Sequence, residues 1–313
     1  MNINDYIKAN WVLFKQIYND DIVLDAVRKE INSDSKKLIK YSEALLDGKW
    51  SKLEGMPPLF ILSTLAISLK PVFDKFIKMG FSESVFYDTM SDVKIWGEDY
   101  RTHHNGDIGV TEINWLQLHF SCQIFKIGRL QYQISKYYFE KSTEYNGVTL
   151  KYGDRCYNIH IPRGAKLDSV SCKKSITLAI DTLEDIFRDI QTDIMMCHSW
   201  LLSPYNQKFV APNSNIAKFA KMFKIVGESD EVEQHFRWIF DIREDNKIFA
   251  KCKKKNGYYY NLENFTPKTS LQAAAKNYIM AGGELSGGKG LLDTKDIIGW
   301  YEKKRFVVVS CHW

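Results

Sequence analysis

The chain has 313 residues, of which 45% are hydrophobic and 26% charged, and its formal net charge at pH 7 is +5. This balance is typical of a globular protein and excludes a disordered or fibrous one. The length suits two ordinary domains, and the modest positive charge permits anionic ligands without requiring a nucleic acid.

The cysteines and the N-terminus both favour a cytoplasmic protein. Six cysteines are spread along the chain without a C-x-x-C pair, which argues against a zinc ribbon and a disulfide framework. Residues 1–11 lack the basic and apolar regions of a secretory signal. The longest nearly apolar run, Pro57 to Leu69, is too short to cross a bilayer and predicts a buried helix. We expect a cytoplasmic protein with no membrane partner and no metal.

The first third of the chain predicts helices. Ser33 or Asp34 can cap a helix that stops at Gly48. A second helix should run from Pro57 to Gly80, with a kink at Pro71, because proline lacks a backbone N–H and clashes with the preceding turn. Ser82 caps a further helix with apolar residues at helical spacing.

Beyond residue 106 the pattern changes to short strands mixed with helices, which predicts a mixed sheet with helices on its faces. We therefore expect an α+β fold with a helical N-terminal domain over 1–106 and an α/β domain over 107–313. The elements expected after residue 106 are helices 111–120, 171–187, 215–222 and 270–280, and strands 124–127, 130–134, 157–161, 194–202 and 306–309.

Two segments in the last quarter have both a functional and a structural interpretation. Asn256-Gly257 predicts a tight hairpin turn, and the lysines 251 and 253–255 beside Tyr258–Tyr260 mix basic and aromatic residues as nucleic-acid surfaces do. Protection of a sheet edge by charge is the plainer interpretation. Gly282-Gly283, Gly287-Gly288 and Gly290 with Lys289 resemble a phosphate-binding segment, but no strand is expected before them, so a flexible loop after a helix is predicted.

The segment from Tyr157 to Lys174 is the most informative one for function. A predicted strand feeds the loop 162–166, which leads to a helix, so free N–H groups and the positive end of the helix dipole are expected beside the sheet edge. Positive charge suited to a diphosphate is added by Arg163, Lys166, Lys173 and Lys174. The alternative is a simple strand-to-helix connection with its basic residues in solvent.

Five motifs occur in an order that resembles a bacterial family of acyltransferase-domain proteins, which joins a helical N-acyltransferase N-terminal domain to a GNAT-like C-terminal domain. The similarity spans roughly residues 35–290. The motifs are I-G-R-L-Q-Y (127–132), I-H-I-P-R-G (159–164), C-H-S-W-L-L-S-P (197–204), P-N-S-N-I-x-x-F (212–219) and T-S-L-Q-x-A (269–274).

The resemblance implies a mixed sheet whose central strands splay to admit the pantetheine arm of acyl-CoA, with the diphosphate on the loop after the fourth strand. Residues 159–161 would be that fourth strand, 171–187 the next helix and 194–200 the fifth strand. The glycine pair usual in such loops is reduced here to one glycine. The residues implied for acyl-CoA, the co-substrate, are Ile161, Arg163, Gly164, Ala165 and Lys166.

The candidate catalytic residues follow from the chemistry of acyl transfer, which needs a base for the amine, donors to the oxyanion and a proton for the thiolate. His160, His198 and Cys197 are the candidates. Cys197 and His198 are adjacent in a strand and point to opposite faces, so they cannot form a dyad. A Cys197–His160 pair through an acyl-cysteine stays open, ranked below direct transfer. For His160, a structural role in the core is the alternative.

Four residues before and within the first predicted hairpin are candidates for binding the acceptor. Glu112 and His119 lie on the helix before the strands, where a solvated helix face is the alternative. Arg129 and Gln131 lie where the hairpin enters the sheet. Arg129 could pair with an acceptor carboxylate or hold the helical domain through an ion pair.

The sequence thus predicts a GNAT-type N-acyltransferase that moves an acyl group from acyl-CoA directly to an amine of a small molecule or peptide. The first alternative is a non-catalytic GNAT-like ligand-binding protein, which the reduced diphosphate loop would suit. The second is a protein that binds nucleic acid through the lysine–tyrosine hairpin, and it is not the expected one.

Overall fold

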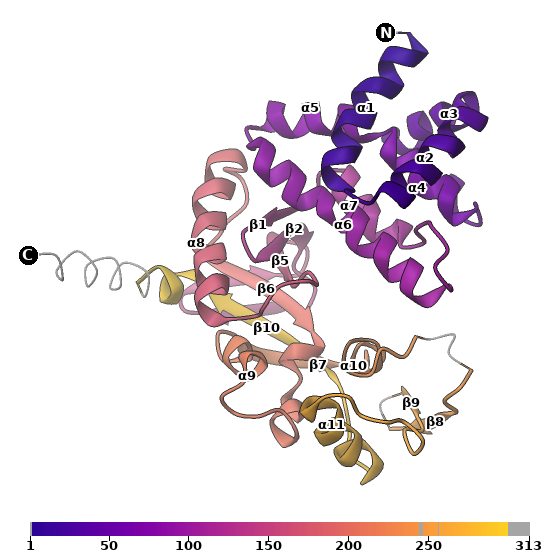
Figure 1. Ribbon diagram of the computed structural model, residues 1–313. Helices are drawn as coiled ribbons and strands as arrows, with labels where there is room; N and C mark the ends of the chain where they lie inside the picture. Colours follow the sequence, from indigo (N-terminus) through magenta and orange to yellow (C-terminus); the bar gives the residue numbers. More distant parts are fainter. Residues whose placement is uncertain (1, 244–246, 256, 300–313) are drawn as a thin grey trace, which may run out of the picture. The chain divides into compact units, whose positions relative to one another are not determined.

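The computed structural model describes residues 2–243, 247–255 and 257–299. The chain forms two compact units (Figure 1). Unit 1 comprises Met1–Gln133 with Ile161–Gly164, and unit 2 comprises Ile134–His160 with Ala165–Trp313.

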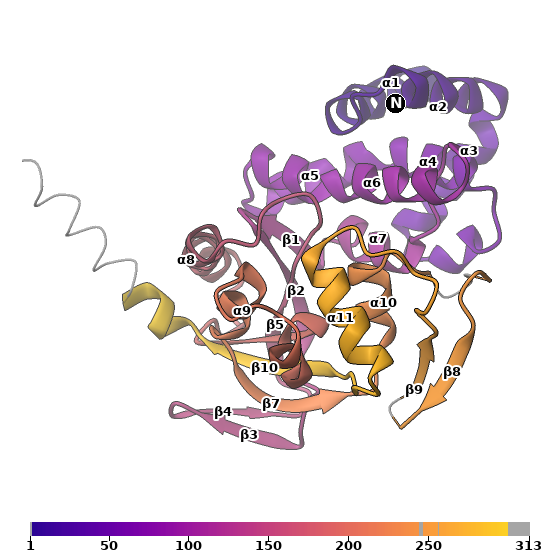
Figure 2. The same ribbon diagram turned by 60° about the horizontal axis from the view of Figure 1, so that its bottom comes forward.

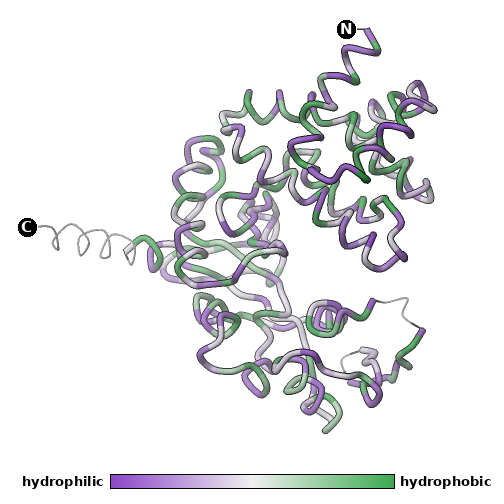
Figure 3. Tube along the Cα trace, in the orientation of Figure 1, coloured by the Kyte–Doolittle hydropathy of each residue, from purple (hydrophilic) through white to green (hydrophobic). Residues whose placement is uncertain are grey.

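Unit 1 is helical apart from one hairpin. Along its helices hydrophilic and hydrophobic residues alternate, as amphipathic packing requires (Figure 3). Its elements are α1 (Ile3–Ile17), α2 (Asp21–Ser33), α3 (Ser35–Leu46), the 3₁₀ helix η1 (Trp50–Leu53), α4 (Pro58–Ala66), α5 (Leu69–Met79), α6 (Glu83–His103), α7 (Ile113–Phe120), β1 (Ile124–Ile127) and β2 (Leu130–Lys136), which ends in unit 2.

The helix ends follow from local side-chain chemistry. The Asp34 carboxylate accepts a hydrogen bond from the N–H of Lys37 at the start of α3, and the Ser82 hydroxyl accepts one from Val85 at the start of α6. Each satisfies a backbone donor that has no partner inside its helix. Gly80 ends α5 in the left-handed region, with φ of 101°. These predicted boundaries are confirmed.

The helix expected from Pro57 to Gly80 is two helices, so the predicted kink at Pro71 is wrong in kind and in place. The chain leaves the helix at Ile67 and Ser68, and Pro71 lies in the first turn of α5. There its missing N–H removes no intrahelical bond, and the break lies upstream because the proline ring conflicts with a helical carbonyl four residues earlier.

The core of unit 1 around its hairpin is aromatic. The Phe76 ring centroid lies 5.5 Å from those of Phe86 and Phe125, and Phe81 stacks on Phe125 at 4.3 Å. All four side chains are buried. Aromatic rings in such contact add to the free energy gained from burial alone, which fixes α5, α6 and β1 to one another.

Unit 2 is a mixed sheet with helices and two additional hairpins. Its further elements are β3 (Ser142–Tyr145), β4 (Val148–Lys151), β5 (Arg155–His160), α8 (Ser169–Ile186), β6 (Ile194–Ser199), the 3₁₀ helices η2 (Trp200–Leu202) and η3 (Pro204–Lys208), α9 (Asn215–Ala220), β7 (Lys224–Ser229), α10 (Glu233–Ile239), β8 (Lys251–Lys254), β9 (Gly257–Tyr260), α11 (Ser270–Met280) and β10 (Gly287–Asp293).

Strands β5, β6, β10 and β7 are neighbours in that order. β5 and β6 are parallel, whereas β10 runs antiparallel to both β6 and β7. The predicted α+β fold, with a helical region followed by a mixed sheet flanked by helices, is confirmed. The parallel pair is joined by α8, as in a strand–helix–strand unit, and α8 lies beside the sheet in both views (Figures 1 and 2).

The prediction of a flexible loop around Lys289 is wrong, because this segment is strand β10, which pairs with β6 on one side and with the edge strand β7 on the other. Its glycines are explained by close packing. A Cβ atom at Gly288 would lie 2.1 Å from the carbonyl oxygen of Leu202, and one at Gly290 would lie 2.8 Å from the Leu202 side chain. Only glycine allows η2 to approach this strand so closely.

The two faces of the sheet are covered by different elements. The β3–β4 hairpin covers one face, where Leu150 packs with Cys156, Met196 and Leu291, and it lies next to β7 in Figure 2. Asn146 in the hairpin turn donates to the Asp293 carboxylate at 2.5 Å. The opposite face is the one that η2 approaches.

The lysine–tyrosine segment forms the predicted hairpin from β8 and β9, although Asn256 lies outside the described residues. Tyr259 and Tyr260 are buried, and Lys254 and Lys251 lie over their rings at 5.5 Å and 5.3 Å. Only Tyr258 of the three tyrosines is exposed, so the hairpin offers no row of rings for stacking bases.

Two other expectations concern the last predicted strand and membrane-spanning helices. The expected closing strand 306–309 lies outside the described residues. Among the residues that are described, no helix has both the length and the apolar character needed to cross a bilayer.

Candidate active site

Two of the candidate histidines lie on the same face of the sheet in unit 2. Asn158 of β5 pairs with Met196 of β6, and this is the one register pair of these parallel strands in the described chain. His160 and His198 each come two residues later, so both side chains point to the same face. By contrast, β6 and β10 pair continuously from Ser199 to Ile194. Both imidazoles therefore lie at the carboxyl ends of β5 and β6, two residues after the register pair of these strands.

His198 lies at the centre of a polar cluster that sequence reasoning did not identify. Its Nε2 atom lies 2.7 Å from the Ser229 Oγ atom at the end of β7. Its Nδ1 atom lies 3.9 Å from a Glu231 carboxylate oxygen and 3.4 Å from the Tyr138 hydroxyl. The Glu231 carboxylate is too far from Nδ1 for a hydrogen bond, but its negative charge favours the tautomer with the proton on Nδ1, which leaves Nε2 to accept from Ser229.

The surroundings keep His198 neutral near neutral pH. Burial lowers the pKa of His198, the Glu231 carboxylate partly offsets this, and Lys289 lowers the pKa further, so that it falls below its ordinary value. Lys289 is the direct cross-strand partner of His198. Burial and Glu231 raise the pKa of Tyr138 to about 12, so its hydroxyl keeps its proton. A neutral imidazole can act as a general base.

A glycine makes the contact between His198 and Ser229 possible. A Cβ atom at Gly287 would lie 2.4 Å from the Ser229 Oγ atom and 3.3 Å from the His198 Nε2 atom. Gly287 is the register partner of Ser229. The absence of a side chain at this position therefore leaves the space in which the two polar atoms meet.

Cys197 lies on the opposite face from both histidines. It is fully buried, and burial raises the pKa of its thiol far above the ordinary value. The thiol is therefore protonated at neutral pH and is a weak nucleophile. Since the β5–β6 register also separates its side chain from that of His160, this geometry does not favour an acyl-cysteine route.

His160 is positioned by its own strand. The Asn158 Nδ2 atom donates to the His160 Nε2 atom at 3.2 Å. Asn158 is 5% exposed, and its Oδ1 atom has no partner among the described residues. The alternation of side chains along β5 places both residues on one face, a signal that the sequence contains.

The predicted diphosphate loop belongs partly to each unit. Within unit 1, the Arg163 guanidinium forms an ion pair with Asp99, whose side chain is 9% exposed. Gly164 has φ of 94° and is exposed, as are Ala165 and Lys166. Within unit 2, the Asp168 carboxylate accepts from the Ser171 N–H at the start of α8. The N-terminus of α8 is thus already capped by a carboxylate.

His119 and Gln131 belong to a buried network in unit 1, which differs from the solvated helix face expected for His119. The Asp92 carboxylate lies 3.1 Å from the His119 Nε2 atom and accepts from the Gln131 amide at 2.9 Å and the Trp115 indole at 2.8 Å. Burial acts to raise the pKa of Asp92, but these donors together lower it below its ordinary value. The burial of His119 and Gln131 favours a structural role for both.

The other two predicted acceptor residues also lie in unit 1. Arg129 donates to the Pro162 carbonyl at 3.0 Å, so it ties the β1–β2 turn to the segment 161–164. Glu112 occupies the N-cap position of α7, is half-buried and makes no capping hydrogen bond there.

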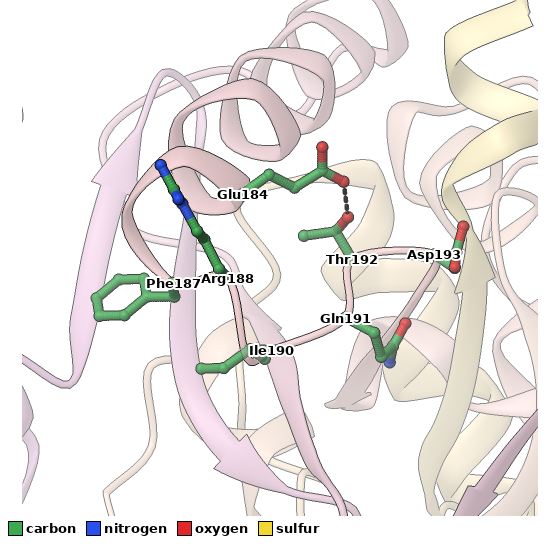
Figure 4. Close-up of a pocket in the computed structure, with 7 residues that line it drawn as sticks. All are labelled: Glu184, Phe187, Arg188, Ile190, Gln191, Thr192 and Asp193. Carbon is green, nitrogen blue, oxygen red and sulfur yellow. Dashed lines mark hydrogen bonds between the residues drawn. The ribbon is translucent and has the colours of Figure 1, made fainter.

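A shallow cavity of about 300 Å³ lies at the other end of β6. It is formed by the end of α8 and the loop before Ile194, and Thr192 donates to Glu184 at its wall (Figure 4). None of the predicted site residues lines it.

The chain matches two family descriptions. Residues 13–122 match the N-acyltransferase N-terminal domain, and residues 124–292 match the GNAT-like C-terminal domain. The second match covers more than half of the chain, so the protein belongs to the family with this GNAT-like C-terminal domain, preceded by its N-acyltransferase N-terminal domain. The family resemblance predicted from the five motifs is confirmed. No curated protein matches the chain.

Solved acyltransferases share the fold. One in complex with CoA and 10C-teicoplanin is 15% identical, with a TM-score of 0.71 over 90% of this chain and 86% of that one. A variant acyltransferase in complex with octanoyl-CoA is 15% identical, with a TM-score of 0.70 over 91% and 87%. For two others, one with decanoyl-CoA and one with decanoyl-CoA and teicoplanin, this chain covers 65% and 66% of their length. At these identities the likeness concerns the fold.

Proposed function

We propose that this protein transfers an acyl group from acyl-CoA directly to an amine of a small molecule or peptide. The observation that carries the proposal is the pair of histidines at the carboxyl ends of β5 and β6, beyond the last register pair of these strands. The family membership and the acyl-CoA complexes of proteins with this fold support the donor.

His198 is the proposed general base, and His160 is a second group at the same sheet edge. The amine lone pair attacks the thioester carbonyl while His198 takes the amine proton, and the departing thiolate then receives a proton. The lowered pKa of His198 suits this role, because the imidazole is already unprotonated at neutral pH. Cys197 is not needed for direct transfer.

The residues proposed for the diphosphate remain those of the sequence prediction, Ile161, Arg163, Gly164, Ala165 and Lys166. Of the four residues predicted for the acceptor, Glu112 and Arg129 remain in the proposal, because His119 and Gln131 are buried in the Asp92 network. Because proteins with this fold have been solved in complex with teicoplanin, a glycopeptide, glycopeptide and peptide amines are the first acceptors to examine.

The donor is tested by binding. Native mass spectrometry of the purified protein should reveal any retained ligand, and octanoyl-CoA and decanoyl-CoA should raise the melting temperature. If neither acyl-CoA stabilises the protein at millimolar concentration, the donor is wrong.

Catalysis is tested by thiol release with a panel of amines. His198→Gln should lower kcat by about 10²-fold or more while acyl-CoA still binds. Cys252→Ala, which changes an exposed thiol, serves as the control. Binding of acyl-CoA without thiol release to any amine would favour a non-catalytic ligand-binding protein instead.

A further inference from the structure

The Ser229 hydroxyl lies directly against the His198 nitrogen that would accept the proton. The Nε2 atom of His198 lies 2.7 Å from the Ser229 Oγ atom, while Nδ1 faces Glu231 and Tyr138. A proton that reaches Nε2 must therefore pass through the Ser229 hydroxyl or displace it. Ser229 at the end of β7 and His198 are both partly exposed, and the His198 side chain is 11% exposed.

We propose that Ser229 is the catalytic residue that meets the acceptor amine and relays its proton to His198, and that Glu231 is a positioning residue that fixes the His198 tautomer. This inference rests on the proposed function. It adds two residues that neither the motifs nor the family matches single out.

In this relay each bond that forms is matched by one that breaks, and the amine proton ends on the leaving thiolate. The amine nitrogen forms a bond to the thioester carbonyl carbon and releases one proton to Ser229 Oγ, which passes its own proton to His198 Nε2. The tetrahedral intermediate collapses, the C–S bond breaks, and the thiolate leaves with the bonding electron pair. The His198 imidazolium then returns the proton to the thiolate, so that amide and free thiol are the products.

The relay is favoured over attack by Ser229 on the thioester. Both routes form an oxyanion on the acyl carbon, but attack by Ser229 would place that oxyanion directly beside the serine oxygen. The groups described around Ser229 are the imidazole, the Glu231 side chain and the space left by Gly287. A carboxylate would repel an oxyanion at this position, whereas it stabilises the imidazolium that the relay creates.

Gly287 provides a test that leaves both polar residues in the chain. Gly287→Ala places a methyl group between Ser229 and His198, and Gly227→Ala is the matched control, because its Cβ would only make an ordinary contact of 3.5 Å with Lys289. Ser229→Ala and Gly287→Ala should each lower kcat by about 10- to 100-fold with little change in KM for acyl-CoA. Ser229→Thr, which keeps a hydroxyl, should recover part of the loss, and Gly227→Ala should not change kcat.

Two measurements separate a relay from a structural effect. For the unmodified protein, the rate in mixtures of H₂O and D₂O should curve with deuterium fraction, because two protons move, and Ser229→Ala should make it linear. Intact mass spectrometry with acyl-CoA and no acceptor should show no acyl group on the protein. An acyl adduct on Ser229, or unchanged kinetics in Ser229→Ala, overturns the relay.

A third measurement does not depend on activity. ¹⁵N spectra of histidine-labelled protein without ligand should show His198 with its proton on Nδ1 and a bare Nε2 at neutral pH. A proton on Nε2 would overturn the relay even if acyl transfer is found. If the tautomer is as expected but no amine is acylated, the proposed function fails and not the geometry.

Discussion

The backbone of Leu202 approaches Gly288 so closely that any side chain at position 288 would overlap with it. The distance from a Cβ atom at this position to the Leu202 carbonyl oxygen would be 2.1 Å, and the overlap would be with backbone and not with a movable side chain. The contact fixes η2 against β10, directly after the strand that carries His198.

Gly288→Ala should therefore destabilise the protein by about 1–3 kcal/mol or more, since overpacking against backbone forces the chain to shift. Urea denaturation monitored by circular dichroism would measure the loss. Gly227→Ala, on the neighbouring strand, should stay within about 0.5 kcal/mol. Equal stability of the two variants would contradict this packing.

The charges around His198 should set the acid limb of the pH–rate profile. The base works unprotonated, so activity falls as the pH drops through the pKa of His198, which lies below its ordinary value. Glu231→Gln removes a carboxylate that raises this pKa, so the acid limb should move to lower pH. Lys289→Met removes a cation that lowers the pKa, so the limb should move to higher pH. Shifts in the same direction, or none, would show that His198 does not control the limb.

A second histidine should make stability sensitive to acid. His235 on α10 is fully buried, with Nε2 3.3 Å from the Asn206 Oδ1 atom, and burial lowers the pKa of His235 to about 3. In the unfolded chain an imidazole takes up a proton near pH 6.5. Between about pH 6.5 and 3 the unfolded state therefore binds one more proton, and stability falls as the pH falls, by about 1.4 kcal/mol per pH unit.

His235→Gln should flatten this dependence, because glutamine stays neutral. Chemical denaturation at pH 7, 6 and 5 would measure the slope for the variant and the unmodified protein. His104→Gln, which changes an exposed histidine at the end of α6, is the matched control. An identical slope in all three proteins would mean that His235 does not contribute to it.

The network of Asp92 in unit 1 should matter for stability. Asp92→Ala leaves the buried His119 imidazole and the Trp115 indole without their acceptor. Each buried donor that loses its acceptor in this way costs about 1–3 kcal/mol. Asp74→Ala, which breaks an exposed ion pair with Lys70, should cost less than about 1 kcal/mol. Thermal and urea unfolding would compare the two, and similar losses would contradict a structural role for the network.

Local chemistry explains which parts of the fold the sequence predicts well. Asp34, Ser82 and Thr269 each accept from an N–H three residues later, and such caps depend only on neighbouring residues. The strands before and after Gly128 follow from alternation in the same way. The domain boundary predicted after residue 106 stays a prediction. The family matches meet between residues 122 and 124, and unit 1 extends to Gln133.

The wrong or missing predictions concern residues whose role depends on a contact with a residue distant in the sequence. The glycines of β10 are typical of a loop by composition, but they are explained by Leu202, which no local pattern reveals. Similarly, no sequence motif marks Ser229 and Glu231 as functional residues. They lie at the end of the edge strand β7 and just after it, where polar residues are ordinary. Their place beside His198 depends on the register of β10 with both neighbours, which is set only by the folded sheet.

The position of β10 between β6 and β7 has a consequence for the protein while it is being made. A ribosome completes β6 long before it reaches β10, so the apolar edge at Met195 and Met196 lacks its antiparallel neighbour until residue 293 has left the exit tunnel. Nascent chains that stall before β10 emerges should expose this edge, bind chaperones and be degraded. When β10 leaves the tunnel, it should pair with β6 and β7 and complete the sheet in one step.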